Sequence, residues 1–219
     1  MTQKVFPKVI IFDWDNTLVN SWSVIQDALN TTFRAYGLRE WEYDEVCTKV
    51  RKSLRDSFPD LFGNSWREAG DLFYSRYAEI HSEKINPICG AEEMLKELRI
   101  LGIRLAIVSN KKGTFLRKES KTLGWDHYFE KIIGASDTKF DKPNRAPVDL
   151  ILAAINIETG PEVWFVGDTD IDMECAYNSK CTPVLLRKKN ISNSSEFLEF
   201  PPTYHFQSCF ELCNYITNM

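Results

Sequence analysis

The chain has 219 residues, of which 43% are hydrophobic, 26% charged and 13% aromatic. This composition is typical of a globular protein and excludes a disordered, collagen-like or disulfide-stapled chain. The formal net charge of −4 argues against a nucleic-acid partner, because affinity for DNA or RNA depends mainly on neutralising phosphates.

Neither a membrane segment nor a secretion signal is evident. No apolar run approaches the roughly 20 residues that a membrane-spanning helix needs, and residues 1–12 lack the apolar stretch of a signal peptide. The six cysteines are scattered without the spacing of a disulfide framework. We therefore expect a cytoplasmic protein, either a monomer or a homodimer, with no membrane partner.

A run of four apolar residues at 9–12 predicts a first strand buried on both faces. No strand pattern follows between residues 20 and 86, where three amphipathic helices are expected. The first spans 25–36, the second spans 46–54 and ends before Pro59, and the third opens at a capping box of Ser65 and Glu68 and reaches Ile80. These patterns predict a helical insert at 20–86, within a core formed by 1–19 and 87–219.

After the insert, short apolar runs alternate with helical repeats. Strands are expected at 105–108, 132–133, 163–166 and 183–186, and helices at 91–101, 116–123, 148–155, 171–176 and 209–216. The polar stretch 187–202 is expected to be a surface loop. Alternating strands and helices predict an α/β fold, a three-layer Rossmann-like core with a parallel sheet and helices on both faces.

Carboxylates follow the first and fourth strands of this core. Asp13 and Asp15 end the run at 9–12, and Asp168, Asp170 and Asp172 follow the run at 163–166. Buried carboxylates are costly unless a positive charge is near them. The alternatives are an Asp-rich turn for the first pair and helix capping for the second group.

Two further polar groups are expected at the same edge of the sheet. Ser109 and Asn110 follow the second strand, and Lys142 precedes Pro143 between the third and fourth strands. Each alone fits a helix cap or a surface charge. Ligand sites of open parallel sheets lie outside the carboxyl ends of the strands. Together, the carboxylates, the hydroxyl and the lysine indicate a site for Mg²⁺ and a phosphate ester.

The ordered set Asp13-x-Asp15-x-Thr17, Ser109, Lys142 and Gly167-Asp168-x-x-x-Asp172 resembles the four motifs of the haloacid dehalogenase superfamily of phosphatases. The helical insert resembles the helical cap of its phosphoglycolate phosphatase and β-phosphoglucomutase branch. The chain departs from the family at Asn16, where glycine is usual. Since Asn tolerates positive φ better than most residues, we expect the turn to be retained.

The resemblance implies a role for each motif residue. Asp13 is the implied nucleophile, which forms an aspartyl-phosphate, and Asp15 the general acid and base. Its presence favours phosphoryl transfer over dehalogenation, since a halide leaves without a proton. Three further implied roles complete the site: phosphate binding by Thr17, Ser109, Asn110 and Lys142; Mg²⁺ binding by the Asp13 side chain, the Asp15 backbone carbonyl and Asp168; and support by Asp172.

The sequence thus predicts a Mg²⁺-dependent phosphatase of a small phosphorylated metabolite. Phosphoglycolate is the first candidate, because Asn110 and Lys111 after Ser109 resemble phosphoglycolate phosphatases. The alternatives are a sugar-phosphate mutase, a nucleotidase or, in another class, an inactive binding or regulatory protein. Four insert cations are candidates to reach a substrate carboxylate or second phosphate, although an exposed helix face is the better interpretation for each one singly: Lys49, Arg51, Lys52 and Arg55.

Overall fold

Six parallel strands form the central sheet, in the order β5-β4-β1-β6-β7-β8. The computed structural model describes residues 5–188 and 195–219. The strands are β1 (Val9–Phe12), β4 (Arg104–Lys112), β5 (Phe129–Ala135), β6 (Val163–Gly167), β7 (Thr182–Leu186) and β8 (Tyr204–Phe206). The first five confirm the predicted strands. The edge strand β8, only three residues long, was not predicted.

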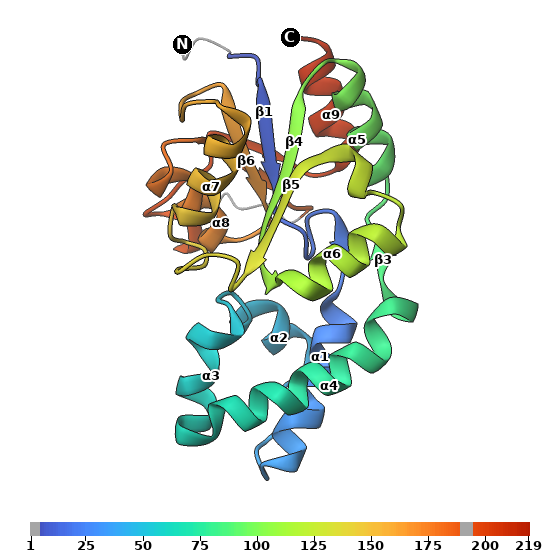
Figure 1. Cartoon of the computed structure of the whole chain (residues 1–219), viewed down its shortest axis with the longest axis vertical. Coiled ribbons are helices and arrows are strands. Elements are labelled where there is room, and N and C mark those ends of the chain that lie inside the picture. Colours follow the sequence, from blue (N-terminus) through green and yellow to red (C-terminus); the bar gives the residue numbers. More distant parts are fainter. Residues whose placement is uncertain (1–4, 189–194) are drawn as a thin grey trace.

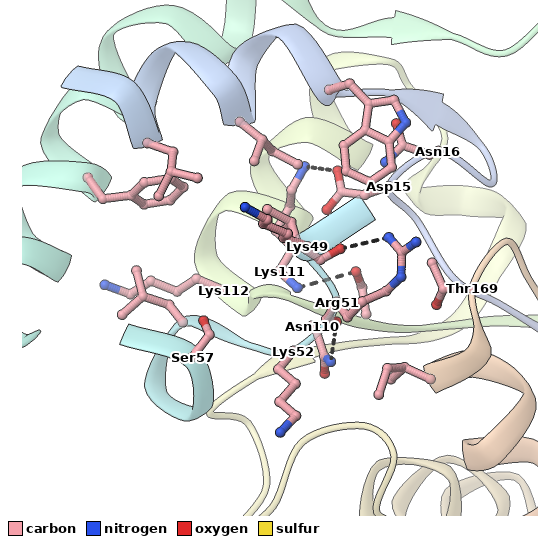
Figure 2. Close-up of a pocket in the computed structure, with 18 of the residues that line it drawn as sticks. Asp15, Asn16, Lys49, Arg51, Lys52, Ser57, Asn110, Lys111, Lys112 and Thr169 are labelled. Atoms are coloured by element: carbon pink, nitrogen blue, oxygen red, sulfur yellow. Dashed lines mark hydrogen bonds and ion pairs between the residues drawn. The ribbon is translucent and has the colours of Figure 1, made fainter. Parts of the chain in front are cut away.

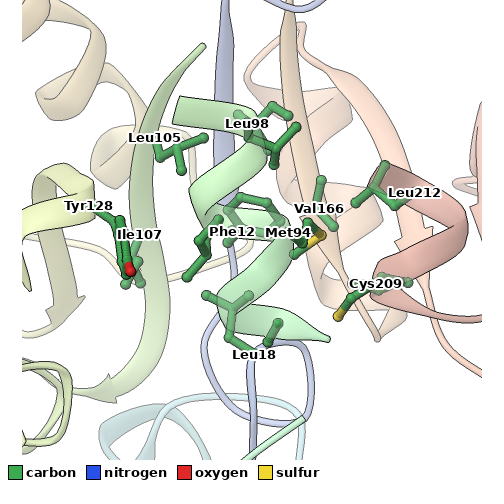
Figure 3. Packing of buried hydrophobic residues seen from close by; sticks show 14 of the residues in the cluster. Phe12, Leu18, Met94, Leu98, Leu105, Ile107, Tyr128, Val166, Cys209 and Leu212 are labelled. Carbon is green, nitrogen blue, oxygen red and sulfur yellow. The ribbon is translucent and has the colours of Figure 1, made fainter. Parts of the chain in front are cut away.

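Helices cover both faces of the sheet, as the alternating pattern predicted (Figure 1). They are α5 (Ala91–Ile100), α6 (Gly113–Thr122), α7 (Ala146–Ile155), α8 (Asp170–Asn178) and α9 (Cys209–Thr217). Ile10 and Phe12 pack with α5 and α9, whereas Val9 and Ile11 pack with α7 and α8. Every residue of β1 is therefore buried. This burial on both faces explains its continuous apolar run. Figure 3 shows Phe12 in the cluster that it forms with Met94 and Leu98 of α5.

The helical insert lies beyond the carboxyl edge of the sheet (Figure 1). It contains α1 (Trp22–Ala35), α2 (Tyr43–Lys49), α3 (Leu54–Phe62), the 3₁₀ turn η1 (Gly63–Ser65) and α4 (Trp66–Lys84). The insert has its own hydrophobic cluster around Leu29, Phe33 and Phe58. Where the chain leaves and re-enters the core, β2 (Val19–Asn20) pairs antiparallel with β3 (Asn86–Pro87).

Three predictions about the insert are wrong. The expected helix at 46–54 is two helices, because α2 ends at Lys49 and Val50 is extended. Pro59 lies inside α3 instead of beyond a helix end, and at the sixth position its missing N–H removes one helical hydrogen bond. Ser65 makes no capping bond, because η1 leads directly into α4.

The remaining elements join the core. The 3₁₀ turn η2 (Asp126–Tyr128) precedes β5, and η3 (Ser195–Phe197) lies in the stretch expected to be a loop. Part of that stretch, residues 189–194, lies outside the described residues. Among the helices that are described, none is both long and apolar enough to cross a bilayer.

Candidate active site

The carboxyl edge of the sheet brings the predicted motif residues together. Asp13 follows β1 directly, Asp168 follows β6, and Lys142 lies between β5 and α7. The Lys142 Nζ donates to Asp13 Oδ1 and to Asp172 Oδ1, both at 2.7 Å. The lysine side chain is 3% exposed. Asp13 and Asp172, which lie 129 and 30 positions from Lys142 in the sequence, thus meet at its buried ammonium group.

This cluster carries more negative charge than Lys142 neutralises. Asp13, Asp168 and Asp172 each offer one carboxylate oxygen within 4.8 Å of the others. Burial raises the pKa of Asp13 to about 6, against the attraction of Lys142 and with the help of Asp172. Burial, together with Asp172 and Asp13, also raises the pKa of Asp168 well above its usual value. A hard divalent cation would satisfy such a cluster.

Asp172 is committed to protein contacts. Besides its bond to Lys142, its Oδ2 accepts from the Asp168 N–H at 3.1 Å and from the N–H and hydroxyl of Thr169 at 3.0 and 2.7 Å. The helix-capping alternative is therefore correct for Asp172, which caps α8. A Cβ on Gly167 would lie 2.3 Å from the Asp172 Cβ, so the turn requires glycine. Asp13 and Asp168 remain as the carboxylates available to a cation.

Asp15 lies on the other side of this site, against Lys111 (Figure 2). The Lys111 Nζ is 2.6 Å from Asp15 Oδ1 and 2.6 Å from Glu119 Oε2. Although Lys111 opens a stretch rich in lysine and arginine at 111–121, its side chain is buried, at 5% exposed. Directly after Asp15, Asn16 has a φ of 62°, which confirms that asparagine retains the turn.

Glu119, in α6, connects Lys111 to the insert. Its buried carboxylate accepts from Tyr77 OH at 2.9 Å and from Trp14 Nε1 at 2.8 Å, and His81 Nδ1 lies 3.0 Å away. Tyr77 and His81 belong to α4 of the insert, so Glu119 joins the two parts of the molecule. Sequence reasoning missed this residue. A single acid in a basic helix gives no signal of its three distant partners.

The predicted phosphate ligands differ in their surroundings. Ser109 is buried at the cavity and accepts from the Lys111 N–H at 3.3 Å. The Asn110 amide donates to the Lys142 carbonyl and accepts from the Lys142 N–H at 3.1 and 3.0 Å, so it holds the Lys142 backbone. Thr17 is fully buried and donates to Asp168 Oδ1 at 3.2 Å.

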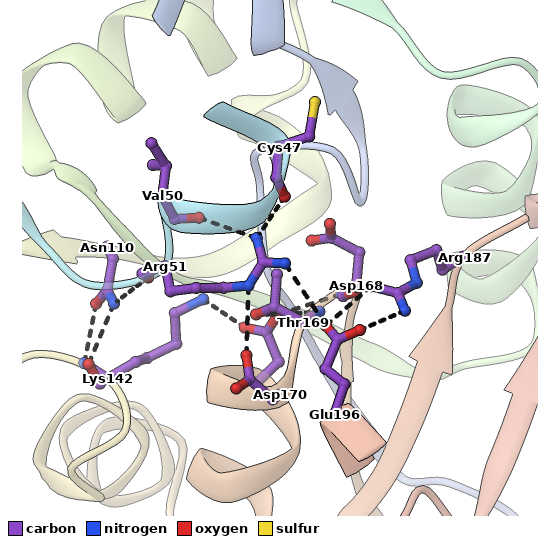
Figure 4. Close-up of polar contacts among 11 residues, drawn as sticks. Cys47, Val50, Arg51, Asn110, Lys142, Asp168, Thr169, Asp170, Arg187 and Glu196 are labelled. Atoms are coloured by element: carbon purple, nitrogen blue, oxygen red, sulfur yellow. Dashed lines mark hydrogen bonds and ion pairs between the residues drawn. The ribbon is translucent and has the colours of Figure 1, made fainter. Parts of the chain in front are cut away.

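The four predicted cations of the insert differ in whether they line the cavity. Lys49, Arg51 and Lys52 line the cavity. Arg51 reaches across to the core, 3.4 Å from Asp170 and 3.6 Å from Glu196 (Figure 4). Arg55 instead forms a bidentate ion pair outside the cavity. Its Nε and Nη2 bind the buried carboxylate of Asp141 at 2.6 and 2.5 Å. Arg51 and Arg55 are therefore contacts between insert and core.

A cavity of about 160 Å³ lies between the sheet edge and the insert. Its core side presents Asp13, Asp15, Ser109, Lys142 and Asp168. Its insert side is formed mostly by apolar and aromatic side chains of α1, α3 and α4. The geometry gives a buried carboxylate that can act as a nucleophile, a second carboxylate that can transfer a proton and donors that can bind an oxyanion, around a space that a small ester can enter.

Comparison with known proteins agrees with this chemistry. Residues 10–185 match the family model described as haloacid dehalogenase-like hydrolase. The chain is 31% identical over 168 residues to a phosphoglycolate phosphatase of Aquifex aeolicus, covering 76% of this chain and 78% of the relative. It is 27% identical over 164 residues to the pyrophosphatase PpaX of Halalkalibacterium halodurans, covering 75% and 76%.

Solved structures share the architecture. The crystal structure of a haloacid dehalogenase-superfamily hydrolase from Ehrlichia chaffeensis superposes with a TM-score of 0.67 at 28% identity. The match covers 99% of this chain and 98% of that one. The overall architecture of the chain is therefore that of a known fold.

Proposed function

The chain belongs to the haloacid dehalogenase-like hydrolase family, and on that premise we propose a Mg²⁺-dependent phosphatase that acts on a small phosphorylated metabolite through an aspartyl-phosphate. The observation that carries this proposal is the position of Asp13. Its carboxylate is buried at the cavity, held at one oxygen by Lys142 and flanked by Asp168. The six cysteines are all free, which fits a reducing cytoplasm.

The proposed reaction has two steps. An Asp13 carboxylate oxygen attacks phosphorus, the ester P–O bond breaks, and Asp15 gives its proton to the leaving oxygen. Water then attacks the aspartyl-phosphate, and its proton passes to Asp15, so that phosphate leaves and Asp13 is restored. Lys111 fixes the orientation of Asp15 through its 2.6 Å contact. Lys142 and Ser109 bind the phosphoryl oxygens.

Asp13 and Asp168 are the proposed side-chain ligands of Mg²⁺, with the backbone carbonyl of Asp15 as a third. Bound there, the ion would offset the charge of the carboxylates and of the ester, so that an anionic nucleophile can approach an anionic phosphate. Asp172 orients Lys142 and the turn at 167–169 rather than binding the ion, because both its oxygens already accept hydrogen bonds.

We also propose that residues 20–86 act as a cap over a core of 1–19 and 87–219. The short β2–β3 pair at these boundaries would carry the connection. Closure of a cap excludes water and completes the site. Asn110 then holds the Lys142 backbone on the core side and donates to the Arg51 carbonyl of the cap at 3.3 Å.

The substrate is a phosphomonoester, and phosphoglycolate is a candidate because relatives bear that name. Sugar-phosphate transfer and nucleotide hydrolysis are alternatives on the same site. An inactive regulatory protein is disfavoured, because Asp13, Asp15 and Lys142 all line one cavity.

The test is hydrolysis of a generic phosphoester and a metabolite panel with and without Mg²⁺. Wild type is expected to release phosphate only with the metal, and Asp13→Asn to lose activity by at least about 10³-fold. Asp60→Asn, the same change at an exposed insert position, is the control. Equally slow hydrolysis by wild type and Asp13→Asn would show that the protein is not a phosphatase of this kind.

A further inference from the structure

The two sides of the cavity differ in chemistry. The core side carries the charged groups already described, whereas the insert side exposes aromatic and aliphatic side chains. Large apolar side chains on this side come from α1, α3, α4 and the segment between α1 and α2, and one comes from α6: Trp22, Trp41, Phe58, Leu61, Phe73 and Phe115. Such a wall is what a binding site for an apolar group presents, with few polar groups to orient the ligand.

This wall is more than the interior of the insert. Trp22, Trp41 and Phe73 pack against its hydrophobic cluster but stay only partly buried, and all three line the cavity. Trp66 packs against the same cluster without lining the cavity. Apolar surface left facing a cavity gains free energy when a ligand removes it from water. The cavity between the sheet edge and the insert, which we call the chamber, therefore favours a ligand with an apolar body.

The cations of the chamber offer few free contacts to a second anionic group of a small substrate, such as a carboxylate. Lys111 is paired with Asp15 and Glu119, and Arg51 lies near Asp170 and Glu196. Lys49 pairs with Glu45 and lies 4.7 Å from the centroid of the Trp41 ring.

Two cavity cations, Lys52 and Lys112, remain at exposed positions. The Lys112 Nζ lies 4.4 Å from the centroid of the Tyr74 ring. At exposed positions water screens their attraction for a carboxylate. The chamber thus offers a short phosphorylated acid weaker contacts than it offers an apolar group.

We infer that the chamber selects phosphate monoesters whose leaving alcohol carries an apolar group of about the size of a phenyl ring, in preference to phosphoglycolate. This inference rests on the proposed phosphatase function, because it places the ester phosphate at Asp13. The phosphate lies among Ser109 and Lys142, and the apolar group lies against the wall formed by Trp41 and Phe73.

The experiment compares kcat/KM for ethyl phosphate, 2-phenylethyl phosphate and phosphoglycolate with Mg²⁺. The two simple esters release alcohols of similar reactivity, so their ratio measures the contribution of the ring. We expect 2-phenylethyl phosphate to exceed both other esters by roughly tenfold or more. Equal values for the two simple esters, or a preference for phosphoglycolate, would overturn the inference while leaving a phosphatase.

Matched variants locate the effect. Trp41→Ala is expected to lower the ratio of 2-phenylethyl to ethyl phosphate by roughly threefold or more, whereas Trp66→Ala leaves it unchanged. Leu61→Phe adds bulk to the chamber without removing packing, and is expected to reduce turnover of the phenylethyl ester selectively. If both variants and the control retain the wild-type ratio, the ring does not bind this wall.

A binding measurement separates this inference from the proposed function. If no ester is hydrolysed, the phosphatase proposal fails, and calorimetry with 3-phenylpropylphosphonate and propylphosphonate tests the chamber directly. Tighter binding of the phenyl compound, by roughly tenfold, supports the apolar site. Equal affinity overturns it.

Discussion

Glu119→Gln is a sharp test of how the insert is joined to the core. The substitution keeps the size of the side chain and removes its charge. In the folded protein the carboxylate contacts Lys111, Tyr77, His81 and Trp14, and it is 1% exposed. A neutral amide cannot neutralise Lys111, and its NH₂ group meets donors where the carboxylate accepted. We therefore expect a loss of stability.

Two estimates of the loss agree. Burial raises the pKa of Glu119, but Lys111, His81 and Trp14 outweigh it and lower the pKa from 4.5 to about 2. At about 1.4 kcal/mol per pKa unit, this shift corresponds to about 3 kcal/mol of stability near neutral pH. Removing one partner of a buried ion pair independently costs roughly 3–5 kcal/mol. A loss of about 3 kcal/mol lowers Tm by roughly 6–12 °C in a chain of this size.

The assay is thermal unfolding of wild type, Glu119→Gln and a control at pH 7. Glu130→Gln is the matched control, because Glu130 forms ion pairs with Arg99 and Arg104 at 3.5 and 3.3 Å in an exposed position. Exposed pairs contribute roughly 0–1 kcal/mol, so the control should lose little. If Glu119→Gln loses no more than Glu130→Gln, the buried carboxylate does not join insert and core as argued.

The lowered pKa of Glu119 also predicts how the loss of stability in Glu119→Gln changes with pH. The folded pKa of Glu119 lies below the unfolded value, so its contribution is complete above about pH 4.5 and is lost as pH falls toward about 2. Glutamine does not titrate. The stability difference between wild type and Glu119→Gln should therefore narrow as pH falls below 4.5, and a difference that widens there would contradict the assigned pKa.

Two further substitutions test the site at other points. Gly167→Ala should strongly reduce phosphatase activity, since the new Cβ would meet Asp172 at 2.3 Å. The control Gly160→Ala, which has open space around the new Cβ, should keep its activity. Equal activities of the two variants would refute the packing argument. Arg55→Ala removes the bidentate pair with the buried Asp141, and should speed hydrogen exchange of residues 50–57 and lower kcat/KM. Unchanged exchange in that segment would show that the pair does not hold insert and core together.

The core was predictable because its signals are local. The apolar run at 9–12 and the alternation after residue 87 can be recognised without knowledge of distant contacts. Because the carboxyl ends of parallel strands meet at one edge, the strand pattern alone predicts that Asp13, Ser109 and Asp168 lie together. The edge strand β8 carried no such signal. Its three residues Tyr204–Phe206 are too short for a period to show.

The insert was less predictable because its helices are shaped by contacts across the cavity. Val50 breaks the expected helix at 46–54, and the chain beyond it meets the core, where Asn110 donates to the Arg51 carbonyl at 3.3 Å. Nothing in the local sequence indicates that contact. Likewise, the charge on Lys111 looked like part of a basic surface, because its partner Asp15 lies 96 positions away in the sequence.

Tyr77 connects the apolar side of the cavity to Asp15, the proposed proton donor. Its ring lines the chamber, while its hydroxyl donates to Glu119 at 2.9 Å. Lys111 then joins Glu119 to Asp15 through two contacts of 2.6 Å, and its Nζ lies 5.3 Å from the Tyr77 ring centroid. On the proposed mechanism, a ligand that moves this ring would act on Lys111, the group that positions Asp15. The apolar wall and the Asp15 carboxylate are parts of one packed unit, although they come from opposite sides of the cavity.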